Sequence, residues 1–405
     1  LMRQGPLYPQ SRQRVLRQRE NTMSTRLSIA MFVDACGWDV VGPRPDWLPE
    51  CHHRQPVESL FGFSSACVPA ILTGARPDEN DHWSSFFYAP ESSPFKSLRM
   101  LRFLPSSLVD RGRVRRYLSM GIARAYGFTG YFQIYNLPFD SLPLFDYAEK
   151  HDIFRPGGIN RGGSIFDDLT ENGTRYHVSN WRRSEEENIA ALERAVEAAE
   201  IEFAFLYTAK LDALMHEHTK DSPLVDDKLD WYRGHVDRIL GKARQRYDEV
   251  RFALFSDHGM ATIHTVVDLM PSLEGLGLTH GRDFVAVYDS TMLRFWFLSD
   301  RAEPLVRAAL PDDATGRWVP EDQLKSYGTW WPDGRFGHAI YALEPGVLMN
   351  PSHMGRVAPA GMHGYRPDHE DSDAALVADF EPERDVRCIT DLYHLMGDMA
   401  AWARA

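Results

Sequence analysis

Three aspartates and three histidines stand in or beside apolar runs and turns, in an arrangement that suits metal binding. The six residues are Asp34, Asp212, His216, Asp257, His258 and His363. Carboxylate oxygens and imidazole nitrogens are ligands for zinc and manganese. A serine in the small-residue turn Gly62-Phe-Ser-Ser-Ala-Cys67 is placed where a nucleophile is needed. These residue types predict a two-metal hydrolase or transferase that acts on phosphate-like esters.

Three of the six residues follow predicted strands. Asp34 ends the apolar run 27–33, and the pair Asp257-His258 follows the run 251–256. In open α/β sheets, ligands bind at the carboxyl ends of the strands. A single Asp or His after a strand is more often a capping or turn residue. The prediction of a metal site therefore depends on the whole set.

The other three residues lie on a predicted helix and in a glycine-rich turn. Asp212 and His216 are four residues apart, which places both on one face of a helix and suits two ligands of one ion. A surface pair at this spacing is the alternative for Asp212 and His216 alone. His363 stands in Gly361-Met-His-Gly364, where small neighbours allow the backbone to approach a bound ion.

The serine segment runs from small residues into an apolar stretch, as at the beginning of a helix. A serine there meets unpaired backbone N–H groups and the positive end of the helix dipole, which favour an alkoxide and phosphoryl oxygens. Ser64 and Ser65 are the two candidates. Taken alone, either would be read as an N-cap.

Short apolar runs alternate with amphipathic stretches, which predicts an α/β fold with a mostly parallel sheet and helices on both faces. Predicted strands are 27–33, 202–208, 251–256 and 374–380. Predicted helices are 184–199, which opens with the capping box Ser184-Glu-Glu-Glu187, then 225–245 and 390–402. These elements place three of the six candidates directly after predicted strands, and the other three on a helix or in a turn.

Two stretches break this alternation, at about 86–165 and about 266–355, and are predicted to be cap insertions over a site within one catalytic domain, 26–405. We expect residues 1–25 to be a disordered N-terminal extension. The first insertion carries eight basic residues between Lys96 and Arg124 against one acid, Asp110. This excess predicts either steering of an anionic substrate, contact with an anionic surface, or a solvated basic helix face.

The composition is that of a globular protein, with 43% hydrophobic and 25% charged residues. The net charge of -12 argues against binding to a nucleic acid duplex. The four cysteines form no CxxC pair, so neither a disulfide framework nor a zinc ribbon is indicated. No apolar run approaches the ~18 residues of a transmembrane helix. We expect a cytoplasmic protein.

The motifs resemble those of the alkaline phosphatase superfamily, and most closely its type I phosphodiesterase/nucleotide pyrophosphatase branch. The matching segments are Ser256-Asp-His-Gly-Met260, Asp212-x-x-x-His216, Gly361-x-His-Gly-Tyr365, and Thr73-Gly74 followed by Arg76-Pro-Asp78. They are spread over nearly the whole chain, apart from the insertions. The resemblance implies an alkaline-phosphatase-like core and a metal-dependent phosphoric ester hydrolase.

The resemblance also implies roles for individual residues. The nucleophile of the family precedes the Thr of Thr-Gly by nine residues, which gives Ser64, with Ser65 as the alternative. The ion that activates Ser64 would be held by Asp34, Asp257 and His258. The second would be held by Asp212, His216 and His363. The resemblance implies two divalent ions, Zn²⁺ or alternatively Mn²⁺, and a small anionic phosphate ester as substrate, hydrolysed through a phosphoseryl intermediate.

The chain departs from the family pattern at two places. The branch usually has a threonine nucleophile in Thr-Phe-Pro-Asn, whereas this chain has Ser64-Ser-Ala-Cys67. Its phosphate-binding asparagine corresponds by position to Ser85. A phosphomonoesterase, a phosphonate hydrolase and a phosphoryl or sulfuryl transferase therefore stay open as alternatives. Cys67-Val-Pro69 lies three residues too late for a sulfatase motif, and the full ligand set argues against a non-catalytic binding protein.

Overall fold

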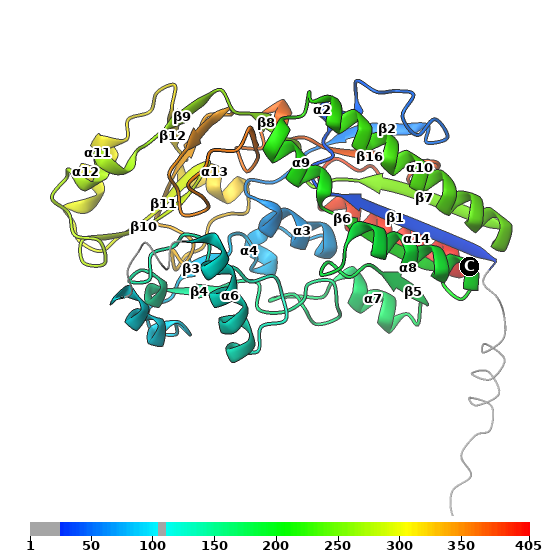
Figure 1. The fold of residues 1–405 in the computed structure, drawn as a ribbon, viewed down its shortest axis with the longest axis horizontal. Helices are drawn as coiled ribbons and strands as arrows, with labels where there is room; N and C mark the ends of the chain where they lie inside the picture. Colours follow the sequence, from blue (N-terminus) through cyan, green and yellow to red (C-terminus); the bar gives the residue numbers. More distant parts are fainter. Residues whose placement is uncertain (1–24, 104–110) are drawn as a thin grey trace, which may run out of the picture.

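The computed structural model describes residues 25–103 and 111–405 (Figure 1). The predicted extension 1–25 therefore lies outside the described residues except for Thr25. A six-stranded sheet forms the centre of the fold, in the order β2-β16-β7-β1-β6-β5. Its strands are β1 (Arg26–Val33), β2 (His53–Val57), β5 (Tyr176–Val178), β6 (Phe203–Thr208), β7 (Glu249–Phe255) and β16 (Ala374–Ala378).

The predicted α/β class is confirmed, and the sheet is mixed. β1 pairs in parallel with both β6 and β7, and β5 pairs in parallel with β6. β16 runs antiparallel to both β7 and β2. The predicted strand 374–380 is observed as β16, and the structure shows that it runs opposite to β7. The four strands β5, β6, β1 and β7 thus end at one edge of the sheet.

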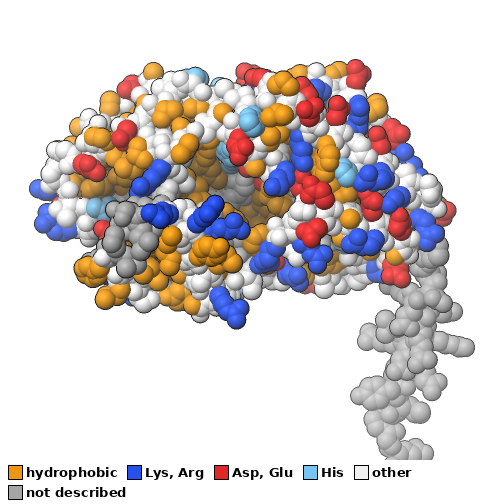
Figure 2. All heavy atoms as spheres, in the orientation of Figure 1, with side chains coloured by type: hydrophobic (Ala, Val, Ile, Leu, Met, Phe, Trp, Pro, Cys, Tyr) orange, Lys and Arg blue, Asp and Glu red, His pale blue; other side chains and the backbone are white. Residues whose placement is uncertain are grey.

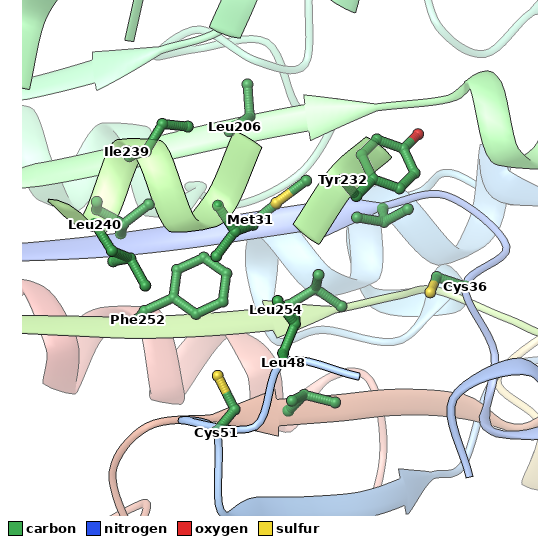
Figure 3. Close-up of a cluster of buried hydrophobic side chains, with 14 of the residues drawn as sticks. Met31, Cys36, Leu48, Cys51, Leu206, Tyr232, Ile239, Leu240, Phe252 and Leu254 are labelled. Atoms are coloured by element: carbon green, nitrogen blue, oxygen red, sulfur yellow. The ribbon is translucent and has the colours of Figure 1, made fainter. Parts of the chain in front are cut away.

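Helices cover both faces of this sheet because its central strands are apolar on both sides. Leu27, Ile29 and Met31 of β1 pack against α8 (Glu185–Ala198) and α10 (Pro223–Arg246). Ala30 and Phe32 point to the other face, where they meet α3 (Ser64–Thr73), α7 (Ile165–Glu171) and α14 (Asp391–Arg404). Figure 3 shows the first of these clusters, in which Met31 lies among side chains of β6, β7 and α10.

Local sequence signals account for the ends of these helices. The Ser184 hydroxyl accepts a hydrogen bond from the N–H of Glu187 at 3.2 Å, and the Glu187 carboxylate accepts one from the N–H of Ser184 at 2.9 Å. The predicted capping box is therefore confirmed, and it begins α8. Ser222 is the N-cap of α10, and Pro223 occupies the first helical position, where no N–H is needed.

The stretch 266–355 contains a second sheet, with four antiparallel strands in the order β10-β11-β13-β12. They are β10 (Phe284–Asp289), β11 (Met292–Phe297), β12 (Gly316–Trp318) and β13 (Ala339–Leu343). Around them lie β9 (Thr265–Val267), β14 (Val347–Met349), α11 (Met270–Glu274), α12 (Ala302–Ala309) and α13 (Glu321–Ser326).

The stretch 86–165 packs against this second sheet. It contains β3 (Phe86–Tyr88), η1 (Lys96–Phe103), α6 (Gly112–Tyr126), η2 (Leu142–Leu144) and β4 (Phe145–Tyr147). Phe86, Phe95 and Phe145 share a buried cluster with Val285 and Trp296 of the second sheet. The two stretches predicted to be insertions thus form one lobe beside the central sheet (Figure 1).

Short elements complete the fold. They are α2 (Trp38–Val41), α4 (Pro77–Asn80), α9 (Lys210–His218), β8 (Ala261–Thr262), β15 (Gly361–Met362) and η3 (Glu370–Ser372). β8 and β15 pair with each other, which holds the turn after β7 against the turn that contains His363. No described helix combines the length and the apolar composition that crossing a bilayer requires.

Candidate active site

The six predicted ligands come together at the carboxyl edge of the central sheet. Asp34 directly follows β1, and Asp257 and His258 follow the neighbouring strand β7. β6 leads into α9, which carries Asp212 and His216, and His363 directly follows β15. Because β6, β1 and β7 are parallel neighbours, their ends bring these side chains to one place.

Asp34, Asp257 and His258 form the first group, and all three are buried. One ligand atom from each lies within 4.8 Å of the others. His258 Nε2 lies 3.2 Å from Asp257 Oδ2 and 3.7 Å from Asp34 Oδ1. This donor set of two carboxylates and one imidazole can hold a divalent cation.

Asp212, His216 and His363 form the second group, whose ligand atoms also lie within 4.8 Å of one another. Asp212 Oδ1 lies 3.2 Å from His216 Nε2, one helical turn away, and 3.4 Å from His363 Nε2. The rings of His258 and His363 stack with centroids 3.8 Å apart, so the two groups are direct neighbours. Two adjacent ligand groups of this kind are what a two-metal site requires.

Backbone and side-chain groups behind the ligands orient them. His216 Nδ1 donates to the carbonyl of Gly361 at 2.8 Å, and His258 Nδ1 donates to its neighbour's carbonyl at 2.9 Å. Each bond assigns the proton to Nδ1 and leaves Nε2 as the metal-facing nitrogen. The Tyr207 hydroxyl donates to Asp34 Oδ2 at 2.7 Å, which leaves Oδ1 for an ion.

The electrostatics of the two groups fit bound cations. Asp34 Oδ1, Asp212 Oδ1, Asp257 Oδ2 and His363 Nδ1 are buried and have no hydrogen-bond partner among the described residues. Burial, Asp257 and Asp212 raise the pKa of Asp34 well above its ordinary value. Burial lowers the pKa of His363 well below the ordinary value of a histidine, and the charges of His258 and His216 lower it further. Crowded, buried ligand atoms without partners are costly unless cations neutralise them, so the residues present fit two divalent ions.

Ser64 lies beside the first group. It is the first residue of α3, and its Oγ is 3.1 Å from His258 Nε2. The unpaired N–H groups and the positive dipole at this helix end favour negative charge on its oxygen and on a phosphoryl group. Ser65 is the next residue, but its hydroxyl donates to the carbonyl of Trp83 at 2.9 Å. These hydrogen bonds therefore distinguish the two serines and favour Ser64 as the candidate nucleophile.

A cavity of about 430 Å³ opens onto these residues. Ser64, Ser65 and Ser85 line it together with Asp34, Asp212, His216 and His363. Ser85, the predicted substrate-binding residue, thus shares the cavity with Ser64. Cys67 is fully buried and does not belong to the lining, as expected of a small core residue. No lysine or arginine of the described chain is among the residues that line the cavity.

Several lining residues had no signal in the sequence. Tyr207 lies within β6, and only the pairing of Phe32 with Tyr207 in the β1–β6 register brings it to Asp34. Tyr131, Glu149 and Trp181 come from segments without regular structure. Burial raises the pKa of Glu149 to about 8, and Asp152 adds to this, while the N–H of Tyr131 opposes the shift by donating to the carboxylate at 3.1 Å.

Three solved structures with the same fold are of ectonucleotide pyrophosphatase/phosphodiesterase 5. The murine member 5 shares 14% identity at a TM-score of 0.64, covering 93% of this chain and 95% of that chain. The human member 5 shares 13% identity at a TM-score of 0.63, covering 93% and 94%. An inactive threonine-to-alanine variant of the murine protein, in complex with AMP, has 14% identity and a TM-score of 0.63 over 93% and 95% of the two chains.

At this level of identity the solved structures show the fold, and the sequence shows the family. No curated protein matches the chain. The sequence profile of the type I phosphodiesterase/nucleotide pyrophosphatase family matches residues 63–366, a span that includes Ser64, five of the six predicted ligands and the second sheet. The chain therefore belongs to the type I phosphodiesterase/nucleotide pyrophosphatase family of phosphoric ester hydrolases.

Proposed function

We propose that this protein hydrolyses phosphodiesters at a two-metal site, through a phosphoseryl intermediate at Ser64. One observation carries the proposal: both ligand groups and Ser64 lie together, with Asp34, Ser64, Asp212, His216 and His363 facing a single cavity. Asp34, Asp257 and His258 would hold one ion, and Asp212, His216 and His363 the other.

Two divalent cations would supply positive charge for the phosphoryl oxygens and would lower the pKa of an alcohol and of water. Imidazole and carboxylate ligands suit Zn²⁺, with Mn²⁺ as the alternative. The side chains and backbone of the protein would contribute by positioning the substrate, because phosphoryl transfer depends mainly on in-line geometry and charge neutralisation. The dipole of α3 and its first N–H groups would hold a phosphoryl oxygen next to Ser64.

Two displacements at phosphorus would complete the reaction. The Ser64 Oγ–P bond forms as the P–O bond to the leaving alcohol breaks, and the serine proton leaves with that alcohol. Water then cleaves the Oγ–P bond and restores the hydroxyl. In the murine protein, a threonine-to-alanine variant, which lacks one side-chain hydroxyl, is inactive.

The lining of the cavity favours a diester over a monoester or a polyphosphate. A diester carries one negative charge at neutral pH, whereas the other two carry more. Since no described lysine or arginine lines the cavity, only the two ions and the N-terminus of α3 would balance added charge.

A substrate panel tests this proposal. A phosphodiester, a phosphomonoester, a sulfate ester and a phosphonate would be assayed with Zn²⁺ or Mn²⁺, using wild type, Ser64→Ala and Ser65→Ala. We expect the diester to be the best substrate and Ser64→Ala to abolish turnover. Preference for the sulfate ester, or transfer to an added alcohol in place of hydrolysis, would overturn the assignment.

A further inference from the structure

The segments η1 and α6 differ in charge from the rest of this acidic chain. They contain no aspartate or glutamate, and their basic residues are Lys96, Arg99, Arg102, Arg113, Arg115, Arg116 and Arg124. The whole chain has a net charge of -12. Arg115 has a structural role, because it is buried and donates to the carbonyls of Tyr135 and Leu137.

The exposed face of α6 combines positive charge with apolar groups. Arg113, Tyr117, Met120 and Arg124 follow one another at intervals of three or four residues, and Arg116 lies beside Tyr117, so they share one side of the helix. Tyr117 is 71% and Met120 59% exposed. The three arginines are exposed, and none pairs with an acid within the described chain. We call these five residues the cap face.

Exposed apolar side chains concentrate around the cap face. Of the eleven large hydrophobic residues exposed in the described chain, six lie between residues 100 and 131. They are Met100, Phe103, Tyr117, Met120, Tyr126 and Tyr131. Figure 2 shows hydrophobic and basic side chains together on the surface over α6, beside a hollow between the two lobes. Apolar groups on a basic helix face are the pattern of helices that lie in a membrane interface.

We propose that the cap face docks on an anionic phospholipid surface. Arginines would approach lipid phosphates, while Tyr117 and Met120 would enter the boundary between headgroups and acyl chains. The chain's own undescribed segments are poor alternatives, because residues 1–24 contain five arginines against one glutamate, and residues 104–110 contain one acid, Asp110. A purely ionic partner would leave the exposed apolar side chains unexplained.

Docking there would bring the cavity to the lipid surface. Tyr131 and Tyr135 follow α6 in the chain and line the cavity, and Tyr131 is also 42% exposed. α6 is anchored to that region from inside, because Ser119 accepts from the N–H of Ile134 at 3.1 Å and Ile122 packs in the shared cluster. These contacts hold α6 against the segment that carries Tyr131 and Tyr135.

Vesicle sedimentation tests the proposal without depending on catalysis. The protein would be mixed with vesicles of phosphatidylcholine alone, or of phosphatidylcholine with phosphatidylglycerol. We expect binding to the anionic vesicles only, weakened by salt. Each basic residue near such a surface contributes about fivefold, so Arg113→Ala with Arg116→Ala should weaken partitioning about 25-fold. Tyr117→Ser with Met120→Ser should weaken it as well.

A matched control removes the same charge elsewhere. Arg194→Ala with Arg246→Ala changes exposed arginines of α8 and α10 and should leave binding within about twofold. A thermal unfolding midpoint equal to that of the wild type verifies that each variant is folded. Equal binding to neutral and anionic vesicles, or an equal loss in the control pair, would overturn the proposal. Binding to a nucleic acid duplex without binding to vesicles would do so too.

Discussion

The hydroxyl of Ser64 and the ring of His258 lie 3.1 Å apart, although 194 positions separate them in the chain. Ser64 begins α3, and His258 follows β7. The fold brings a helix N-terminus to the carboxyl end of a central strand. This contact places the proposed nucleophile beside the group of Asp34, Asp257 and His258, and not beside the group of Asp212, His216 and His363.

Removing the Ser64 hydroxyl should therefore remove the chemistry. We expect Ser64→Ala to lower kcat for a phosphodiester by roughly 10³-fold or more, because no other hydroxyl has this position. Ser65→Ala should lower it by less than about tenfold, since the Ser65 hydroxyl is bonded to the Trp83 carbonyl. Steady-state kinetics of both variants check this. The reverse order of effects would reassign the nucleophile to Ser65.

The Tyr207 hydroxyl is predicted to act through Asp34. Tyr207→Phe removes the hydrogen bond to Asp34 Oδ2 and should weaken binding of one ion about 10- to 100-fold. Added metal should restore most of the lost activity, which a defect in substrate binding would not show. Titration with Zn²⁺ measures the change. Wild-type affinity together with a lowered kcat at saturating metal would contradict this role and place Tyr207 in contact with substrate.

The sequence was sufficient to predict the central strands and to single out the six side chains that the fold brings together, since both depend on local patterns. Apolar runs ending in Asp or His mark the ends of β1 and β7, and the spacing of Asp212 and His216 marks α9. The direction of β16 was not predictable, because an apolar run does not show which strand it will pair with or in which orientation. Tyr207 was missed for a similar reason, as its contact with Asp34 follows from strand register.

The second sheet was missed because its strands lie in a stretch rich in Gly, Pro and Trp, without the alternation of apolar runs and helical stretches that identified the central strands. Phe284 and Ala286 of β10 belong to one cluster, and Val285 and Val287 belong to another. β11 likewise divides Leu293 and Trp296 between these clusters. Such strands show no alternation of apolar and polar residues, so the period that identifies a half-buried strand is absent.

Glu149 should make stability depend on pH. Its folded pKa of about 8 is raised, so the folded protein keeps a proton that the unfolded chain releases at lower pH. Its contribution is present below the unfolded pKa and is lost as pH rises through about 8. We expect Glu149→Gln to lose less stability than wild type between about pH 5 and about pH 9 in urea unfolding. The exposed Glu171→Gln is the control, and identical pH profiles for all three proteins would contradict the prediction.

Arg294 should stabilise the second lobe. It is fully buried, and its Nε lies 2.6 Å from Asp289 Oδ2 while Nη1 donates to the Phe86 carbonyl at 2.9 Å. Arg294→Leu leaves Asp289 buried without its partner and should cost about 3–5 kcal/mol of unfolding free energy. The double variant with Asp289→Leu should recover much of this loss. A double variant as unstable as the sum of both single changes would show that the pair is not coupled.

The metal content of the purified protein tests the two-ion site most directly. After metal removal, dialysis against Zn²⁺ or Mn²⁺ and removal of free ion, elemental analysis should find two equivalents per chain. Asp257→Asn and Asp212→Asn should each lose one equivalent, because these residues belong to different ligand groups. One equivalent or less in the wild type, or two in either variant, would contradict the account.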